Sequence, residues 1–289
     1  MTKFGKLFGL TKPGIAVLLD LVAVTTFALG LKSVSEMWKV VPLLVSGTLA
    51  SFSSSLANNF IDRDIDTRMG RTRWRASIGN RAGYILSVPL LLGISLTVSL
   101  VYLNIPTTLW IFGGFLSYSL LYTVLLKRRT SWNIVIGGIA GSFPALAGWS
   151  SVNSSISMIS FFVAVIVFLW TPTHFWTLAL KYREDYREAN IPMLPAVKNE
   201  NYTVNAIFIN TLILVAFSFL PVFINMGFPV FYDLLLIPLS AYLIWRVLSI
   251  RFKNGKSLLA SSLKAFLASN YYLSALLLIL ILGAVLRML

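Results

Sequence analysis

Apolar runs of about twenty residues alternate with short polar segments along the whole chain. An α-helix of that length crosses about 30 Å of hydrocarbon at 1.5 Å per residue. The pattern therefore predicts an all-α integral membrane protein, with nine transmembrane helices in a single bundle around a central cavity. The predicted spans are Pro13–Leu31, Val40–Asn58, Gly83–Leu103, Thr107–Leu126, Trp132–Ser150, Ile156–Leu180, Val204–Ile224, Pro229–Leu248 and Ala268–Leu286.

The basic residues fall unevenly on the two sides that these spans define. The N-terminal segment and the loops on its side hold 21 of the 24 lysines and arginines, whereas Lys32, Lys39 and Arg287 fall on the other side. Because basic loops stay in the cytoplasm, the N-terminus is predicted to be cytoplasmic. No linker-like segment interrupts the chain and no cleavable signal peptide is expected, so residues 1–289 are predicted to form one membrane domain.

The composition agrees with an integral membrane protein and excludes several types of functional site. A hydrophobic fraction of 57% and a mean hydropathy of +0.81 exclude a soluble protein. The formal net charge of +14 indicates orientation and contact with anionic headgroups, and no nucleic-acid partner is expected. The chain contains no cysteine, which excludes disulfides, thiolate nucleophiles, iron–sulfur clusters and cysteine-ligated zinc.

Polar residues recur at a regular interval after the second predicted span. Asn58, Asp62 and Asp66 are spaced four apart, which places them on one face of a helix, whereas Asp64 points elsewhere. Hard oxygen ligands in this arrangement suit Mg²⁺, which takes its remaining ligands from water and phosphate oxygens. A solvated, charged loop is the simpler alternative, but arginines alone would set the topology and would leave the carboxylates unexplained.

A second polar constellation lies at the inner end of the sixth predicted span. Pro172 is expected to kink the helix or free a carbonyl close to His174, the only histidine of the chain. His174 either binds a substrate or packs between helices. In the loop that follows, Lys181 and Asp185 are four residues apart and share a face. Two acidic loops on one side predict a two-part metal clamp around a diphosphate, with basic side chains on the remaining phosphate oxygens.

A third stretch, between the fourth and fifth predicted spans, contains three adjacent cations. Lys127 and Arg128 face the same side as the two acidic loops, so they contact phosphate or serve as positive-inside anchors. The next span contains four glycines and Pro144 between residues 137 and 148. This thin face permits either close helix packing or the approach of a flat ligand.

With these residues in view, the chain resembles the intramembrane UbiA-type prenyltransferase superfamily, and in particular its haem branch, the protohaem IX farnesyltransferases. Asn58, Asp62 and Asp66 match the superfamily motif Asn-x-x-x-Asp-x-x-x-Asp. Two blocks are specific to the haem branch: Lys-Arg-Arg-Thr-x-x-Asn-Ile with its glycine-rich helix at 127–149, and Trp-Thr-Pro-x-His-Phe-Trp through Pro-Met-Leu-Pro at 170–195. The family's phosphate-binding arginine after Pro13 is missing, and Lys12 or Arg73 is expected to substitute for it.

The resemblance implies a Mg²⁺-dependent enzyme that transfers a farnesyl group from farnesyl diphosphate to a vinyl group of haem b. Water adds at the same vinyl, giving haem O and diphosphate. The implied metal ligands are Asn58, Asp62, Asp66 and Asp185, with Lys127 as a further catalytic residue. The implied substrate-binding residues are Arg63, Arg71, Arg73, Arg128, Lys181, Tyr122, His174 and Trp170.

The same resemblance implies a multi-pass protein of the cell membrane whose active-site loops face the cytoplasm. Its implied partners are farnesyl diphosphate, haem b and membrane lipid, with haem A synthase or terminal oxidase assembly downstream.

Two other functions remain open from the residues. The prenyl acceptor could be a quinone precursor or another lipid, since the diphosphate half of the site would be shared. A transporter would instead need Asp20 and Asp233, which lie within predicted spans, to line a path. The other carboxylates cluster at one membrane edge, whereas transporter sites lie near the midplane.

Overall fold

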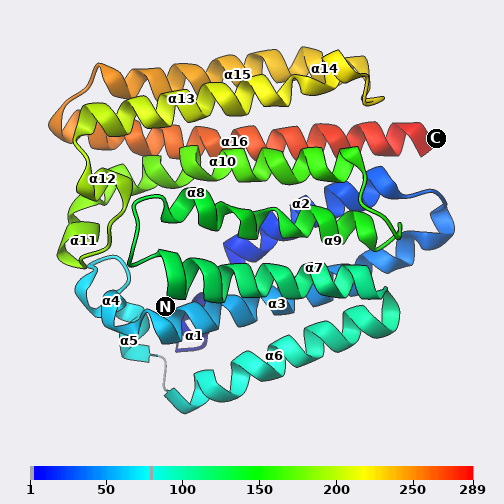
Figure 1. Cartoon of the computed structure of the whole chain (residues 1–289), viewed down its shortest axis with the longest axis horizontal. Helices are drawn as coiled ribbons and strands as arrows, with labels where there is room; N and C mark the ends of the chain where they lie inside the picture. Colours follow the sequence, from blue (N-terminus) through cyan, green and yellow to red (C-terminus); the bar gives the residue numbers. More distant parts are fainter. Residues whose placement is uncertain (1–2, 79–80, 289) are drawn as a thin grey trace.

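The computed structural model describes residues 3–78 and 81–288, and in that part of the chain the regular elements are all helical. The long helices lie side by side along the longest axis of the molecule (Figure 1). They are α2 (Pro13–Gly30), α3 (Val40–Ile61), α6 (Arg81–Tyr102), α7 (Ile105–Leu116), α10 (Met158–Lys181), α13 (Glu200–Ser218), α15 (Val230–Arg251) and α16 (Gly255–Met288). The π-helical segment η2 (Ser117–Leu126) prolongs α7, and α14 (Leu220–Ile224) follows α13.

The described residues contain eight continuous helical segments long and apolar enough to cross a membrane, where the sequence predicts nine spans. The difference lies in the predicted span Trp132–Ser150, which is divided into α8 (Asn133–Gly137), the 3₁₀ segment η3 (Gly138–Gly141) and α9 (Phe143–Ser150). These three pieces still follow one another along the bundle between α7 and α10 (Figure 1). Of the nine predicted spans, eight are therefore continuous in the described residues, and the ninth is a broken segment that does not confirm the predicted count.

Small residues and a proline account for the break. Pro144 stands in the first turn of α9, where its missing N–H costs no helical hydrogen bond. Gly148 allows α9 to pack directly on α2: a Cβ at this position would lie 2.0 Å from the carbonyl oxygen of Ala23. A Cβ at Gly138 would meet Thr171 of α10 at 3.1 Å. The segment therefore gives up regular helix geometry and gains close contact with both neighbours.

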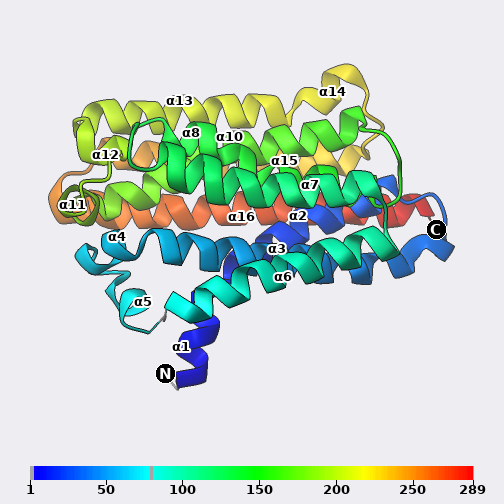
Figure 2. The ribbon, with the colours of Figure 1, turned by 60° about the horizontal axis from the view of Figure 1, so that its bottom comes forward.

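Short helices gather at one end of the bundle. They are α4 (Arg63–Arg68), α5 (Arg73–Ile78), α11 (Arg183–Glu188) and α12 (Leu194–Val197) (Figure 1). The first helix, α1 (Lys3–Leu10), projects away from the long helices (Figure 2). At the other end, the 3₁₀ segment η1 (Val34–Lys39) connects α2 to α3.

Apolar packing holds the two polar loops together. Ile65 and Met69 from α4 and its end form one buried cluster with Tyr186, Ile191 and Met193 from the loop after α10. A larger cluster joins α10, α13, α15 and α16, including Tyr232, Leu243 and Tyr272, which are almost fully buried. Many large apolar side chains are exposed, such as Leu86 at 70%, as expected for helices that face lipid.

Candidate active site

The polar face predicted after the second span is present and buried. Helix α3 ends at Ile61, yet the backbone N–H of Asp62 donates to the carbonyl of Asn58, and that of Asp66 donates to Asp62, both at 2.8 Å. The four-residue spacing therefore continues across the junction with α4. Asn58, Asp62 and Asp66 are only 5%, 1% and 5% exposed. These three oxygen-bearing side chains lie in a dry environment where charge interactions are strong.

Two lysines from distant parts of the chain neutralise this face. Lys12, at the head of α2, donates from Nζ to Oδ1 of Asn58 at 2.6 Å. Lys127, directly after η2, forms an ion pair with Oδ2 of Asp62. Burial, followed by the positive charges of Arg75 and Lys127, lowers the pKa of Lys12 to about 7. The site thus gathers basic side chains where a diphosphate would need them.

The π-helical geometry of η2 aims several side chains at the motif. Thr123 donates to the carbonyl of Tyr118, five residues earlier, and accepts from Nδ2 of Asn58 at 3.1 Å. The hydroxyl of Tyr118 lies 3.4 Å from Nζ of Lys12, and its ring stacks on that of Tyr122. Short π-helical turns are frequent at functional sites. Sequence reasoning missed Tyr118 and Thr123, because an apolar run gives no signal for a π turn.

Arg75 is a third residue that sequence reasoning missed. It is half-buried, and its charge acts on both Asp66 and Lys12. Burial raises the pKa of Asp66, against the opposing effects of the nearby Thr72 hydroxyl and the charge of Arg75. Nε of Arg75 has no hydrogen-bond partner. The only sequence signal was that Arg75 belongs to the basic loop.

The arginines named from the sequence lie differently. Arg63 and Arg73 are exposed, and Arg73 donates to the carbonyl of Thr67. Arg128 forms a bidentate pair with Asp64 at 2.7 and 2.8 Å and lies 3.8 Å from Asp62. This pairing lowers the pKa of Asp64. The structure therefore places Lys12 and Lys127 in direct contact with the buried motif, with Arg128 3.8 Å from Asp62 at its edge.

The second acidic loop meets the first loop but does not complete a single ligand cluster. Oδ2 of Asp185 accepts a long hydrogen bond, 3.4 Å, from the backbone N–H of Arg71. The side chains of Arg71 and Lys181 both lie over the ring of Tyr182, at 5.2 and 5.3 Å from its centroid. Among the residues that the structure describes, no three acidic or histidine side chains come close enough to hold one metal ion. Asp62, Asp66 and Asp185 do not converge on one point.

The buried motif nevertheless fits a magnesium–diphosphate complex. Mg²⁺ is usually held through one or two carboxylates, with substrate phosphates and water supplying the rest, so a closed protein cage is not needed. Oδ1 of Asp62 is buried and has no hydrogen-bond partner. An unpaired carboxylate oxygen costs free energy in a dry site unless a ligand reaches it.

His174 is part of α10, and its side chain packs against α16. Its ring stacks on Trp170 at 4.1 Å between centroids and lies 4.5 Å from that of Phe266. Nδ1 is 3.0 Å from the hydroxyl of Ser269, and that hydroxyl donates to the carbonyl of Phe266. The Ser269 hydroxyl has one proton, which it donates to the carbonyl of Phe266. Toward His174 the hydroxyl oxygen can therefore only accept, so the ring proton lies on Nδ1. The neutral ring then leaves the lone pair of Nε2 free.

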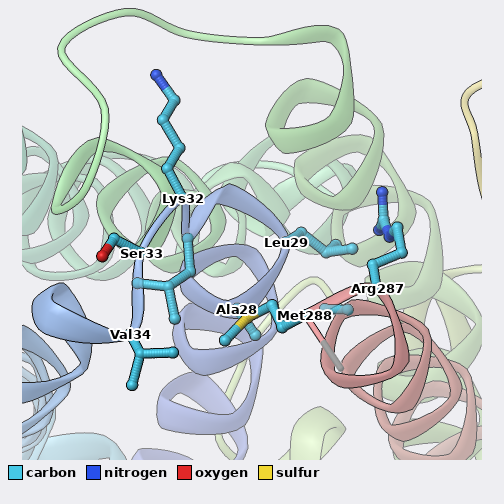
Figure 3. Close-up of a pocket in the computed structure, with 9 residues that line it drawn as sticks. Ala28, Leu29, Lys32, Ser33, Val34, Arg287 and Met288 are labelled. Carbon is cyan, nitrogen blue, oxygen red and sulfur yellow. The ribbon is translucent and has the colours of Figure 1, made fainter.

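A pocket of about 370 Å³ lies at the far end of α2 and α16 and plays no part in this site (Figure 3). Lys32 and Arg287 flank it, and none of its lining residues is acidic. Helix α2 begins beside Lys12 and runs for 18 residues, which separates the pocket from the motif by about 27 Å.

Comparison with known proteins gives consistent results. The curated protoheme IX farnesyltransferase 2 of Picrophilus torridus is 44% identical over 244 residues, which cover 83% of each chain. The protoheme IX farnesyltransferase of Saccharolobus islandicus strain Y.G.57.14 is 38% identical over 94% of each chain. The model of the UbiA prenyltransferase family matches residues 19–270.

Solved structures share the fold at low sequence identity. A digeranylgeranylglyceryl phosphate synthase superimposes with a TM-score of 0.73 at 15% identity, over 99% of both chains. A UbiA homologue from Archaeoglobus fulgidus, bound to DMAPP and Mg²⁺, superimposes with a TM-score of 0.71 at 15% identity, over 97% of this chain and 99% of the other. The family match over most of the chain and the similarity to these curated relatives lead to one conclusion: the protein is a member of the UbiA prenyltransferase family.

Proposed function

We propose that this protein transfers a farnesyl group from farnesyl diphosphate to a vinyl group of haem b, with addition of water, and so makes haem O and diphosphate. The observation that carries the diphosphate half is the buried row Asn58, Asp62 and Asp66 with Lys12 and Lys127 on its oxygens. The haem half is supported by relatives that are 38–44% identical and named protoheme IX farnesyltransferase.

The diphosphate site combines hard anions with fixed cations. Asn58, Asp62 and Asp66 would hold Mg²⁺ from the protein side. Oδ1 of Asp62, which makes no hydrogen bond, is the first candidate ligand. Bound there, Mg²⁺ would neutralise the diphosphate and stabilise the charge that develops as the allylic C–O bond breaks. Asp185, on the facing loop, would join as a ligand only once substrate draws the loops together.

The basic side chains bind the phosphate oxygens. Lys12, Lys127 and Arg75 reach the buried side of the motif, and Arg71 and Lys181 approach from the second loop. Arg128, Arg63 and Arg73 lie at the rim and attract the anionic substrate into the site. The rings of Tyr118 and Tyr122 stack on each other, and Tyr118 lies beside Lys12. Aromatic faces such as these would stabilise the allylic cation by about 1–2 kcal/mol once it is desolvated.

His174 and Trp170 serve the acceptor. The hydrogen bond from Nδ1 to Ser269 fixes the tautomer that presents the Nε2 lone pair, which is the form that ligates iron. Ser269 thereby plays the part of the outer partner that orients a metal-binding histidine. The site as a whole would lie on the cytoplasmic side of the cell membrane, and the product would pass to haem A synthase or to terminal oxidase assembly.

An assay with purified protein in lipid nanodiscs tests this function. Haem b, farnesyl diphosphate and Mg²⁺ are supplied, and haem products are identified by mass spectrometry. The expected product is haem b that has gained a farnesyl group and a hydroxyl. Release of diphosphate with a quinone precursor but not with haem would assign the acceptor differently, and absence of diphosphate release with either would contradict prenyl transfer.

A further inference from the structure

A row of hydroxyl side chains continues the motif face of α3 toward the middle of the bundle. Ser55 and Ser54 stand three and four residues before Asn58, Ser51 stands seven before it, and Thr48 ten before it. In a helix these offsets share one face, in steps of about 5 Å per turn. The row therefore begins beside the proposed diphosphate site and extends about 15 Å along α3.

Ser51, Ser54 and Ser55 are buried residues whose hydroxyls have no hydrogen-bond partner. The three residues are 8%, 7% and 3% exposed, and within the described chain none of their hydroxyls makes a hydrogen bond. Elsewhere on α3, Ser46 donates to the carbonyl of Pro42, and Ser53 donates to that of Val88 on α6. Serines that serve only helix packing form such backbone bonds, so the three free hydroxyls need another explanation.

At the end of the row farthest from Asn58, Thr48 contacts the carboxylate of Asp20. Thr48 donates to Oδ2 of Asp20 on α2 at 2.6 Å. Gly47 leaves room for this approach, since a Cβ there would lie 3.2 Å from Oδ1 of Asp20. Asp20 forms no ion pair with any described residue, although it lies within a membrane-spanning helix. An acidic group at such a depth is expensive unless it has a function.

Water is the ligand that fits this row. A hydroxyl without a protein partner is satisfied by a bound water, which makes nearly as good a hydrogen bond as a protein group. The farnesyl chain and the porphyrin face offer no hydrogen bonds, so neither satisfies serine hydroxyls. Each hydroxyl both donates and accepts, so waters and side chains together form a continuous path from Ser55 to Thr48 and Asp20.

We infer that the Ser51, Ser54 and Ser55 row holds the water that adds to the haem vinyl group, and that Asp20 accepts the proton of that water through Thr48. This inference rests on the proposed function. The C–O bond of farnesyl diphosphate breaks and diphosphate keeps the electron pair, while the terminal vinyl carbon bonds to the farnesyl carbon. The cation left beside the porphyrin ring takes the oxygen of the held water, and the released proton moves along the row to Asp20.

The row also keeps the reacting water away from the allylic cation, which forms first. Water delivered early would quench the allylic cation and give farnesol. On this inference, the row must therefore hold its water until the C–C bond has formed and the second cation is present. Without held water, that second cation loses a proton from the neighbouring carbon and gives an alkene that is lighter than the hydroxylated product by one water.

Product partition tests this inference directly. Ser51→Ala/Ser55→Ala and Asp20→Asn are compared with wild type and with Ser53→Ala, whose hydroxyl faces α6 and lies outside the row. The ratio of alkene to hydroxylated haem product is measured by mass spectrometry, with ¹⁸O-labelled water to trace the oxygen. The two test variants should raise this ratio roughly tenfold or more, and Ser53→Ala should leave it unchanged.

The ratio does not depend on how much protein folds, so a destabilised variant still reports. Equal ratios in wild type and both test variants would overturn the inference while leaving farnesyl transfer intact. A rise in Ser53→Ala as large as in the test variants would also overturn it, since the effect would then come from general loosening of α3. Absence of any haem product from wild type would overturn the proposed function and this inference together.

Discussion

The ammonium of Lys127 forms an ion pair with the carboxylate of Asp62, across 65 positions of sequence, and both side chains are shielded from solvent. Asp62 is 2% exposed in its side chain and Lys127 is 13% exposed. The same carboxylate accepts from Asn58 at 2.6 Å. One contact therefore ties the end of α3 to the end of η2 and sets the position of the proposed catalytic carboxylate.

Removing the lysine alone should destabilise the protein. Lys127→Met removes the cation in closest contact with the buried carboxylate of Asp62 and leaves only Arg128, at 3.8 Å, to compensate it. Breaking a buried ion pair costs about 3 kcal/mol in comparable sites. Asp62→Asn/Lys127→Met removes both charges and should recover most of that loss. Thermal unfolding in one detergent measures both variants. If the double variant is no more stable than Lys127→Met, the ion pair does not carry the stability assigned to it.

Asp62→Asn should reduce prenyl transfer by roughly a hundredfold or more, because the amide lacks the charge that would hold Mg²⁺ against the leaving diphosphate. Asp64→Asn is the matched control, since Asp64 is exposed and paired with Arg128. Its rate should stay within about threefold of wild type. The rate is followed as diphosphate release at increasing Mg²⁺ concentration. Similar losses in both variants would contradict a special role for the buried carboxylate.

Arg75→Gln should raise KM for farnesyl diphosphate roughly tenfold, because a half-buried guanidinium beside Asp66 is replaced by a neutral group. Arg73→Gln, two residues away and exposed, should change KM little. Initial rates at saturating haem b give both values. The assignment of Arg75 would be wrong if Arg73→Gln had the larger effect.

His174→Ala should abolish haem turnover and weaken haem binding while leaving farnesyl diphosphate affinity unchanged. Ser269→Ala tests the tautomer, because without the Ser269 hydroxyl the proton is free to move from Nδ1 to Nε2. Haem affinity should then fall less than in His174→Ala, by roughly tenfold. Absorbance titration with haem b measures both. Unchanged haem spectra in His174→Ala would exclude ligation of iron by this residue.

Gly148→Ala should destabilise the packing of α9 on α2 by about 1–3 kcal/mol, because the added Cβ would fall 2.0 Å from the carbonyl oxygen of Ala23. Gly93→Ala is the control, since no atom lies within 4 Å of a Cβ there. It should be neutral or slightly stabilising, because alanine favours helices. Thermal unfolding of the two variants gives the comparison. A neutral Gly148→Ala would mean that the two helices separate easily.

The sequence determined the class of the fold and the first half of the site. Span length follows from bilayer thickness, and the four-residue spacing of Asn58, Asp62 and Asp66 follows from helix geometry, so both can be read from residue order alone. The break in the span Trp132–Ser150 could not, because it depends on how closely Gly138 and Gly148 approach α10 and α2. Glycines and a proline in the sequence indicate that a helix can break. Whether it does break depends on how the adjacent helices α2 and α10 pack against it.

Tertiary structure decided which of the candidate cations lie against the motif. By sequence Arg63 and Arg73 are as close to the motif as Arg75, and Lys12 lies 46 positions from Asn58. Folding turns the first two toward solvent and brings Lys12, Arg75 and Lys127 to the buried face. The reason is that contacts between helices depend on crossing geometry and on the π turn of η2, neither of which leaves a periodic trace in the sequence. Local spacing therefore fixed the acids, and long-range packing chose their partners.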